Sequence, residues 1–326
     1  MVAWARPKKA YTRAAEGWKD GSGQFSRELD PITRHTRLGE KMSSTFDFLP
    51  SQVRATVLAI GCVVVTVGHS QPSGRPTATT DWTFSVGGGV LVTPAFPGAS
   101  DYQVSLVPDI RASYRDLFTA SVDDGARYHL IKTDNWRVGP LLGIDFGRDQ
   151  DGSSPFKVTG NSPEALKGLP DIETTLEGGM FAAYEPGPWT LQVDLVRTLG
   201  EHEGLHADLS LNYRWSVTPA SGNPRMATRF STGPRLTWAD TDDMNAYFGV
   251  STAASAGSGL PAYQAQSGVR AVGWGLNMIR PLNDRWAVLA IANFEQLTGD
   301  AADSPLVRQE GEPKQFTAGL FVSYRL

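Results

Sequence analysis

Long stretches of alternating polar and apolar residues constrain this chain more than any other feature. In residues 205–217, Leu209, Leu211 and the other odd-numbered positions are apolar, whereas Asp208, Ser210 and the other even-numbered positions are polar or charged. A period of two residues is typical of a β-strand, because successive side chains of a strand point to opposite faces. The pattern therefore predicts an all-β protein in which each strand has one apolar face.

Strand length favours lipid rather than water next to this apolar face. Most of the predicted strands exceed the about 5–6 residues of an average soluble strand and reach the about 9–11 residues that cross a bilayer at a tilt. Trp and Tyr residues cluster near the strand ends, where a membrane interface would place them. Twelve strands are predicted, at residues 82–92, 102–113, 116–122, 126–132, 136–147, 172–184, 188–199, 205–217, 225–239, 268–280, 285–297 and 314–326.

The connections between these strands alternate between short and mostly long. Those at 114–115 and 185–187 are tight turns, whereas those at 148–171, 240–267 and 298–313 are long. This asymmetry is typical of outer-membrane barrels, whose long loops face outside and whose chain ends face the periplasm. We predict a transmembrane antiparallel up-and-down β-barrel of about twelve strands over residues 82–326. The alternative is a soluble β-sandwich or lipocalin-like barrel, with shorter strands and an inward apolar face.

The segment before the barrel is predicted to direct export. Residues 57–67 form the only sustained apolar run, and eleven residues fit a signal peptide but not a spanning helix, which needs about 20. Because small residues follow this run, we place signal cleavage between Ser70 and Gln71. Residues 42–70 would then be the signal peptide. Residues 1–41 are charged and lack apolar periodicity, which indicates a disordered leader or an over-extended start, and residues 71–81 would form a periplasmic segment.

Charge and cysteine content exclude several classes of function. Residues 72–326 hold 20 basic and 28 acidic residues, a net charge of −8. So acidic a body is a poor match for a phosphate backbone, and no nucleic acid is expected as a partner. The single cysteine, Cys62, excludes a disulfide framework and a metal centre with several thiolate ligands.

No cluster of residues predicts catalysis, and no catalytic, cofactor-binding or metal-binding residue is assigned. The stretch Glu201-His-Glu-Gly-Leu-His206 looks superficially like a zinc motif, but such a motif needs both histidines on one helical face. Here His206 lies in a predicted strand and His202 in the turn before it. A serine-hydrolase triad has no set sequence order, so order alone leaves it open. The mature chain nevertheless has no Gly-x-Ser-x-Gly motif.

The polar face of the predicted barrel is its most informative set of residues. If the apolar face meets lipid, ten charged side chains are expected in the lumen: Arg137, Glu173, Glu177, Asp194, Asp208, Arg214, Arg225, Arg229, Arg235 and Arg270. Mixed charges can pair across strands and fill a barrel, or they can line a passage. Barrels of about 8 strands are filled by side chains, whereas 16–18 strands leave an aqueous channel. Twelve strands lie between these cases.

Several motifs also carry a family resemblance. They include Thr93-Pro-Ala-Phe-Pro-Gly-Ala-Ser-Asp-Tyr102 and the stretches 139–149, 204–214 and 299–307, and they span nearly the whole predicted barrel. Together they resemble the MltA-interacting protein (MipA)/OmpV family of outer-membrane proteins. The resemblance implies an outer-membrane barrel. For the best-known members it also implies a scaffold that joins a lytic transglycosylase to a peptidoglycan synthase.

The C-terminus resembles an assembly signal. Residues Thr317, Gly319, Val322, Tyr324 and Leu326 are similar to the signal read by the barrel-insertion machinery, although such barrels usually end in Phe. We therefore expect a non-enzymatic protein of the Gram-negative outer membrane, surrounded by lipid and lipopolysaccharide and acting as a scaffold in peptidoglycan turnover. A narrow channel or uptake porin for small solutes is the alternative, and an outer-membrane hydrolase is a third possibility. No cofactor is expected.

Overall fold

The computed structural model describes residues 81–200 and 202–326. The leader at 1–41, the signal peptide at 42–70 and all but the last residue of the segment 71–81 lie outside the described residues. None of the described helices is long and apolar enough to cross a membrane.

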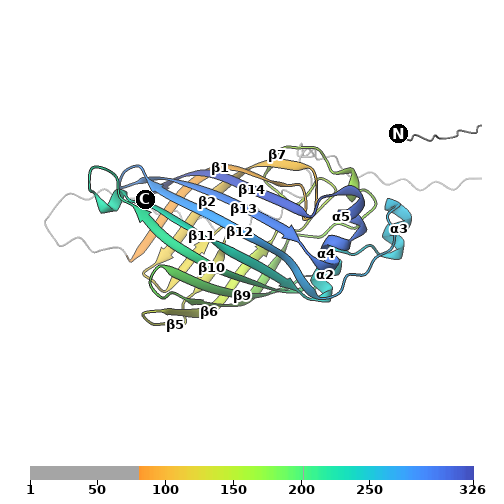
Figure 1. The fold of residues 1–326 in the computed structure, drawn as a ribbon, viewed down its shortest axis with the longest axis horizontal. Coiled ribbons are helices and arrows are strands. Elements are labelled where there is room, and N and C mark those ends of the chain that lie inside the picture. The colour runs from red at the N-terminus through yellow and green to blue at the C-terminus, as the bar shows by residue number, and fades with distance from the viewer. Residues whose placement is uncertain (1–80, 201) are drawn as a thin grey trace, which may run out of the picture. The chain divides into compact units, whose positions relative to one another are not determined.

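Twelve antiparallel strands close into one barrel (Figure 1). Strand β1 pairs with β2 on one side and with β14 on the other, and this pairing closes the sheet. Each strand pairs with its neighbours along the chain, so the predicted up-and-down barrel and its strand number are confirmed. The wall consists of β1 (Trp82–Pro94), β2 (Tyr102–Tyr114), β3 (Phe118–Ser121), β4 (Gly125–Tyr128), β6 (Trp136–Asp145), β8 (Thr175–Tyr184), β9 (Trp189–Thr198), β10 (Leu205–Val217), β11 (Thr228–Ala239), β12 (Gly268–Pro281), β13 (Trp286–Leu297) and β14 (Lys314–Arg325).

The third and fourth wall strands differ from the prediction. Strands β3 and β4 have four residues each, whereas the other wall strands have 10 to 14. The predicted strand 126–132 is broken after Tyr128, because the N–H of Leu130 bonds back to the carbonyl of Tyr128 and turns the chain out of its extended path. Two short strands supplement this part of the wall: β5 (Ile131–Lys132) pairs with β6, and β7 (Lys157–Thr159) pairs with β2.

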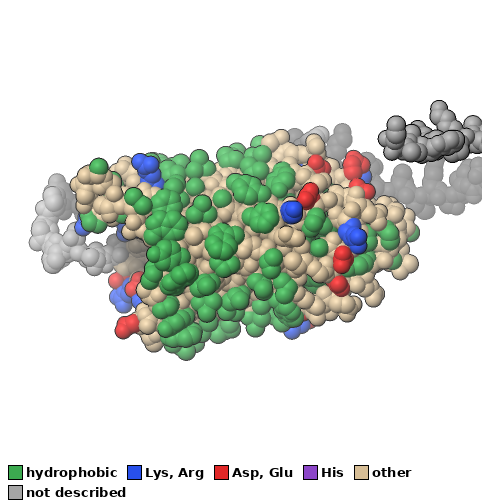
Figure 2. All heavy atoms as spheres, in the orientation of Figure 1, with side chains coloured by type: hydrophobic (Ala, Val, Ile, Leu, Met, Phe, Trp, Pro, Cys, Tyr) green, Lys and Arg blue, Asp and Glu red, His purple; other side chains and the backbone are tan. Residues whose placement is uncertain are grey.

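The apolar face of the wall points outward. Leu209 and Leu211 of β10 are 40% and 38% exposed, and Figure 2 shows apolar side chains spread over the wall, with most charged ones gathered near its two ends. An apolar surface this extensive marks contact with lipid. We call the end that carries the C-terminus and the short turns the turn end. Aromatic pairs ring it, such as Trp136 with Tyr184, whose ring centroids are 4.7 Å apart, and Trp189 with Tyr213, at 5.0 Å.

The opposite end is covered by the long connections, which we call the cap (residues 95–101, 146–174, 240–267 and 298–313). The cap contains the 3₁₀ turn η1 (Glu164–Leu166) and the helices α2 (Thr241–Phe248), α3 (Thr252–Ser258), α4 (Gly299–Asp303) and α5 (Pro305–Glu310). Most of the buried apolar side chains of the described chain lie in or directly under it, including Phe96, Leu166, Met244, Phe248 and Leu306. The packed core therefore closes one end of the barrel and does not fill it.

Candidate functional site

Charged side chains in the lumen are segregated along the barrel axis. Strand register places Asp145, Glu177 and Asp208 on the inward face near the cap, and Asp243 of α2 lies beside them. At the turn end the inward positions are held by a second set of residues, in which basic side chains predominate: Arg137, Arg214, Arg229 and Arg325. The lumen is therefore acidic beneath the cap and basic at the turn end.

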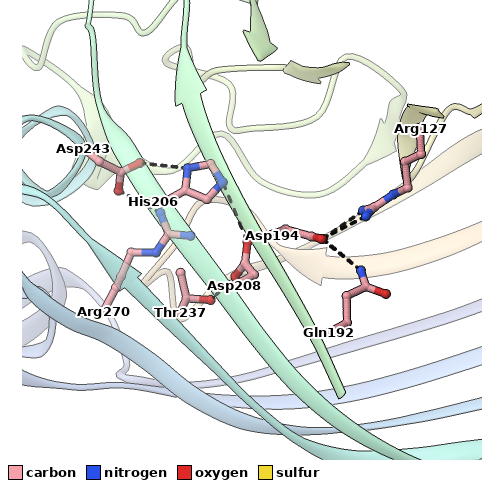
Figure 3. A network of polar contacts seen from close by, with 8 residues as sticks. All are labelled: Arg127, Gln192, Asp194, His206, Asp208, Thr237, Asp243 and Arg270. Carbon is pink, nitrogen blue, oxygen red and sulfur yellow. Dashed lines mark hydrogen bonds and ion pairs between the residues drawn. The ribbon is translucent and has the colours of Figure 1, made fainter. Parts of the chain in front are cut away.

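Beneath the cap, His206 of β10 lies between two carboxylates (Figure 3). Its Nδ1 is 3.6 Å from Oδ2 of Asp243, and its Nε2 is 3.7 Å from Oδ2 of Asp208. Arg270 donates from Nη1 to Oδ1 of Asp243 over 2.9 Å, and the hydroxyl of Thr237 donates to Asp208. The network joins α2 of the cap to three neighbouring wall strands.

A β-bulge directs Arg270 into this network. The pairing of β11 with β12 shifts at Thr237 and Trp238, so that Ala271 and Val269 have partners in β11 and Arg270 between them has none. Bulges re-aim side chains in this way. Regular alternation would have placed Arg270 on the lipid side with Val272, because the two positions differ by two residues.

Burial and two neighbouring side chains set the pKa of Asp243. Its side chain is 3% exposed, and burial raises the pKa of that carboxyl. The hydrogen bond from His206 and the charge of Arg270 act in the opposite direction and prevail, so the pKa of Asp243 lies below its ordinary value. Asp243 is therefore a buried anion that the wall neutralises.

A second set of contacts fastens the cap to β6. The hydroxyl of Tyr247 donates to Oδ2 of Asp145 over 2.5 Å, and Arg148 donates from Nη1 to the Tyr247 carbonyl over 3.0 Å. Burial, followed by the charge of Asp145, raises the pKa of Tyr247, so the phenol remains a donor. Burial also lowers the pKa of Arg148 to about 10. These contacts hold the cap closed.

The groups under the cap are arranged to hold structure together. The hydroxyl of Thr237 donates its hydrogen bond to Asp208. A nucleophilic hydroxyl would instead donate to a histidine base, and His206 receives no such bond from Thr237. His202 lies outside any helix, with its Nε2 3.5 Å from Oδ2 of Asp145. Within 81–200 and 202–326, no three His, Cys, Asp or Glu side chains are positioned to hold a metal ion.

A further ion pair lies within the lumen (Figure 3). Arg127 of β4 binds Asp194 of β9 with two parallel N–H···O bonds of 2.9 Å, and Gln192 donates to the same carboxylate. Because β6 and β8 lie between β4 and β9 in the sheet, this pair bridges two strands that are not neighbours and passes through the lumen in front of β6 and β8. The Arg127 guanidinium also lies 5.3 Å from the centroid of the Phe181 ring.

A cavity of about 280 Å³ lies between this ion pair and the turn end. Its charged lining is mainly basic. Glu185 pairs with both Arg137 and Arg214 at its outer side. The residues that define it here are Arg127, His129, Arg137, Phe181, Glu185 and Arg214.

Of the other residues that the sequence predicted to lie in the lumen, some face it and others lie outside the wall strands. Glu177 points into the lumen, and Arg235 lies 3.9 Å from Glu295. Two of the predicted lumen residues lie outside the wall strands, and both are exposed. Glu173 precedes β8, and Arg225 lies in the 3₁₀ turn η2 (Pro224–Met226). The strands predicted from 172 and 225 therefore begin later, the second because Asn223 caps the turn by accepting from the N–H of Arg225.

Sequence reasoning missed the residues of the cap. Asp243 falls in the long connection 240–267, to which no site residue was assigned, yet it is buried. The signal was present in residues 240–248, where Asp240 caps α2 by accepting from the N–H of Asp243 and Met244, Tyr247 and Phe248 follow at helical spacing. In the terminal strand, Thr317 and Gly319 face inward and Val322 and Tyr324 face outward, as alternation requires.

The match to a protein family covers nearly the whole barrel. Residues 86–326 match the family of MltA-interacting protein MipA. This chain belongs to that family. The earlier resemblance is thereby confirmed, and the barrel is an outer-membrane protein. No curated protein matches the chain.

Solved structures similar to this chain are bacterial outer-membrane proteins. OprD from Pseudomonas aeruginosa is 13% identical, with 68% of this chain and 59% of that chain covered and a TM-score of 0.30. OmpT of Vibrio cholerae is 7% identical, with 78% and 100% covered and a TM-score of 0.29. The N-terminal β-barrel domain of Pseudomonas aeruginosa OprF is 11% identical, with 47% and 88% covered and a TM-score of 0.20.

Proposed function

We propose that this protein is a non-enzymatic scaffold that holds enzymes of peptidoglycan turnover at the inner face of the outer membrane. The observation that carries the proposal is the closed cap. Helix α2 and the loop 146–174 are packed over one mouth of the barrel and fastened to its wall by Asp243 and Tyr247. A barrel closed at that end is suited to holding a partner from the other side.

The family supports a periplasmic partner. MltA-interacting protein MipA is named for binding MltA, a lytic transglycosylase. In this proposal the turn end faces the periplasm and meets a lytic transglycosylase and, through it or beside it, a peptidoglycan synthase. Lipid and lipopolysaccharide surround the wall, and the barrel-insertion machinery reads Thr317, Gly319, Val322, Tyr324 and Leu326.

Partner capture tests this function directly. The folded barrel, immobilised in detergent micelles, is incubated with a purified lytic transglycosylase of the MltA type, with the synthase, and with both. Specific retention of the transglycosylase is expected, and of the synthase when both are present. An unrelated outer-membrane barrel of equal strand number is the control. Equal retention on both barrels would contradict the scaffold function.

A channel is the alternative, because the lumen carries charged and solvent-reached side chains such as Asp124, which is 64% exposed. The same purified barrel in planar bilayers distinguishes the two. A scaffold with a closed cap is expected to show no steady conductance. Replacing residues 241–266 by a short turn should open the mouth and produce conductance. Steady conductance of the unaltered protein would favour the channel.

A further inference from the structure

The turn end of the lumen holds more positive charge than its own carboxylates neutralise. Arg137 forms an ion pair with Glu185, and Nη2 of Arg214 lies 3.4 Å from the same Oε2 atom. Among the described residues, Glu185 is the only carboxylate within ion-pair distance of either arginine. Each guanidinium has five N–H donors, so one carboxylate leaves most of them available.

The cavity of about 280 Å³ places these donors around a space that is open on one side. Arg127 contributes little net charge there, because Asp194 neutralises it through two hydrogen bonds. Arg137 and Arg214 remain, and their side chains are 31% and 44% exposed. A second carboxylate could therefore reach both guanidiniums without displacing a buried pair.

Glu185 shows which chemistry this arrangement accepts. Burial raises the pKa of Glu185, but the two arginines outweigh burial and hold the pKa below its ordinary value. One ionised carboxylate is thus already stabilised between two guanidiniums. Planar bidentate recognition of carboxylate is the geometry at which arginine excels.

The position of the cavity indicates which kind of ligand supplies such a carboxylate. The connection between β8 and β9 beside it has only residues 185–188, so this part of the rim offers little surface to a protein partner. The acidic groups under the cap, among them Asp208 and Asp243, would stop an anion from travelling further. We propose that the cavity binds an acidic peptide segment of a periplasmic protein, with a side-chain carboxylate of the peptide between Arg137 and Arg214. This proposal rests on the scaffold function above.

A peptide-binding measurement tests the proposal. The mature protein, purified from outer membranes in detergent micelles, is titrated with fluorescein-labelled hexaglutamate, and binding is followed by fluorescence anisotropy at low salt. The double variant Arg137→Gln/Arg214→Gln should bind about tenfold more weakly or worse, since it loses two charge-assisted contacts. The matched control is Arg280→Gln/Arg285→Gln, which removes two charges from the same end outside the cavity and should bind as the unaltered protein does.

Three further arms complete the experiment. Glu185→Gln removes the competing carboxylate and should tighten binding several-fold, which keeps the proposal testable if the double variant does not fold. Labelled hexaglutamine should not bind. Citrate and inorganic phosphate should compete only weakly.

Each adverse result is decisive. Equal loss in the two double variants, or no tightening in Glu185→Gln, overturns the site. Binding of citrate or phosphate without binding of hexaglutamate overturns the peptide ligand. Failure of partner capture with hexaglutamate binding intact would refute the scaffold function and leave the cavity's ligand standing.

Discussion

At the scale of single residues, the two faces of a strand differ in what they tolerate. Leu209 is exposed on the lipid side of β10, and its neighbour Ser210 faces the lumen opposite Arg235 and Gln192. Two adjacent residues of this strand therefore contact different surroundings, lipid hydrocarbon for Leu209 and the polar lumen for Ser210. This sharp contrast is a property of the pleat.

We expect Leu209→Arg to impair folding or insertion and Ser210→Arg to be tolerated better. An arginine at the bilayer midplane costs about 2–4 kcal/mol on the lipid face of such barrels, and less near the interfaces. Folding yield into vesicles measures the difference. A fluorophore at residue 209, but not at 210, should be quenched by lipid-borne quenchers. Equal quenching at both positions would contradict the assigned faces.

Asp243 is predicted to make the cap sensitive to acid. Its pKa is lower in the folded protein than its ordinary value, so its contribution to stability is complete above the unfolded pKa and is lost as the pH falls through the folded one. With an ordinary value of 3.8, the loss falls below about pH 4. Asp243→Asn, which leaves Arg270 without its carboxylate, should destabilise the cap by about 3–5 kcal/mol.

Hydrogen exchange of residues 241–258 between pH 6 and pH 3 checks this expectation. Protection in the unaltered protein should fall at acid pH, and Asp243→Asn should be unprotected throughout. Asp242→Asn alters an exposed neighbour on the same helix and should behave as the unaltered protein does. An unchanged pH profile in Asp243→Asn would show that another group controls the cap.

At the scale of elements, the wall and the cap are built by different rules. Wall strands are specified by alternation and paired with their sequence neighbours. The cap draws on four separate connections, and its two apolar clusters join Phe96 to Leu306 and Ile172 to Phe248. A local pattern therefore suffices for the wall, whereas the cap depends on contacts between distant loops.

The orientation of the cap is a prediction at this scale. An epitope tag inserted after Asn161, in the exposed part of the loop 148–171, should be labelled by antibody on intact cells. The same tag inserted after Ser221, in the turn between β10 and β11, should be labelled only after permeabilisation. The reverse pattern would mean that the cap faces the periplasm, and it would contradict the scaffold as proposed.

For the whole molecule, the route to the membrane starts with processing of the N-terminus. We propose that export removes residues 42–70, and we expect the mature chain to begin at Gln71. Mass spectrometry of the protein from isolated outer membranes measures its N-terminus. A lipid-modified Cys62, or a retained segment 1–41, would contradict this prediction. A Ser70→Arg variant, with a large charged residue before the cleavage point, should accumulate uncleaved.

The sequence by itself determined the fold class, the strand number and the side of each strand that meets lipid. Alternation is set by the covalent geometry of the extended chain, so Leu209 and Ser210 could be assigned without any distant contact. The two ends of the barrel could be told apart because short and long connections alternate along the sequence. Even the bulged Arg270 was assigned to the lumen, although only because it is charged.

Only the tertiary structure decided how the lumen is closed and where its charges meet. Arg127 reaches Asp194 from 67 positions away, and Arg148 reaches Tyr247 from 99 positions away. The burial of Asp243 and the cavity beside Arg137 likewise arise from loops and strands that meet only after the barrel curves and closes. The physical reason is that a pleat repeats along one strand, whereas a contact across a lumen depends on the curvature of the whole sheet.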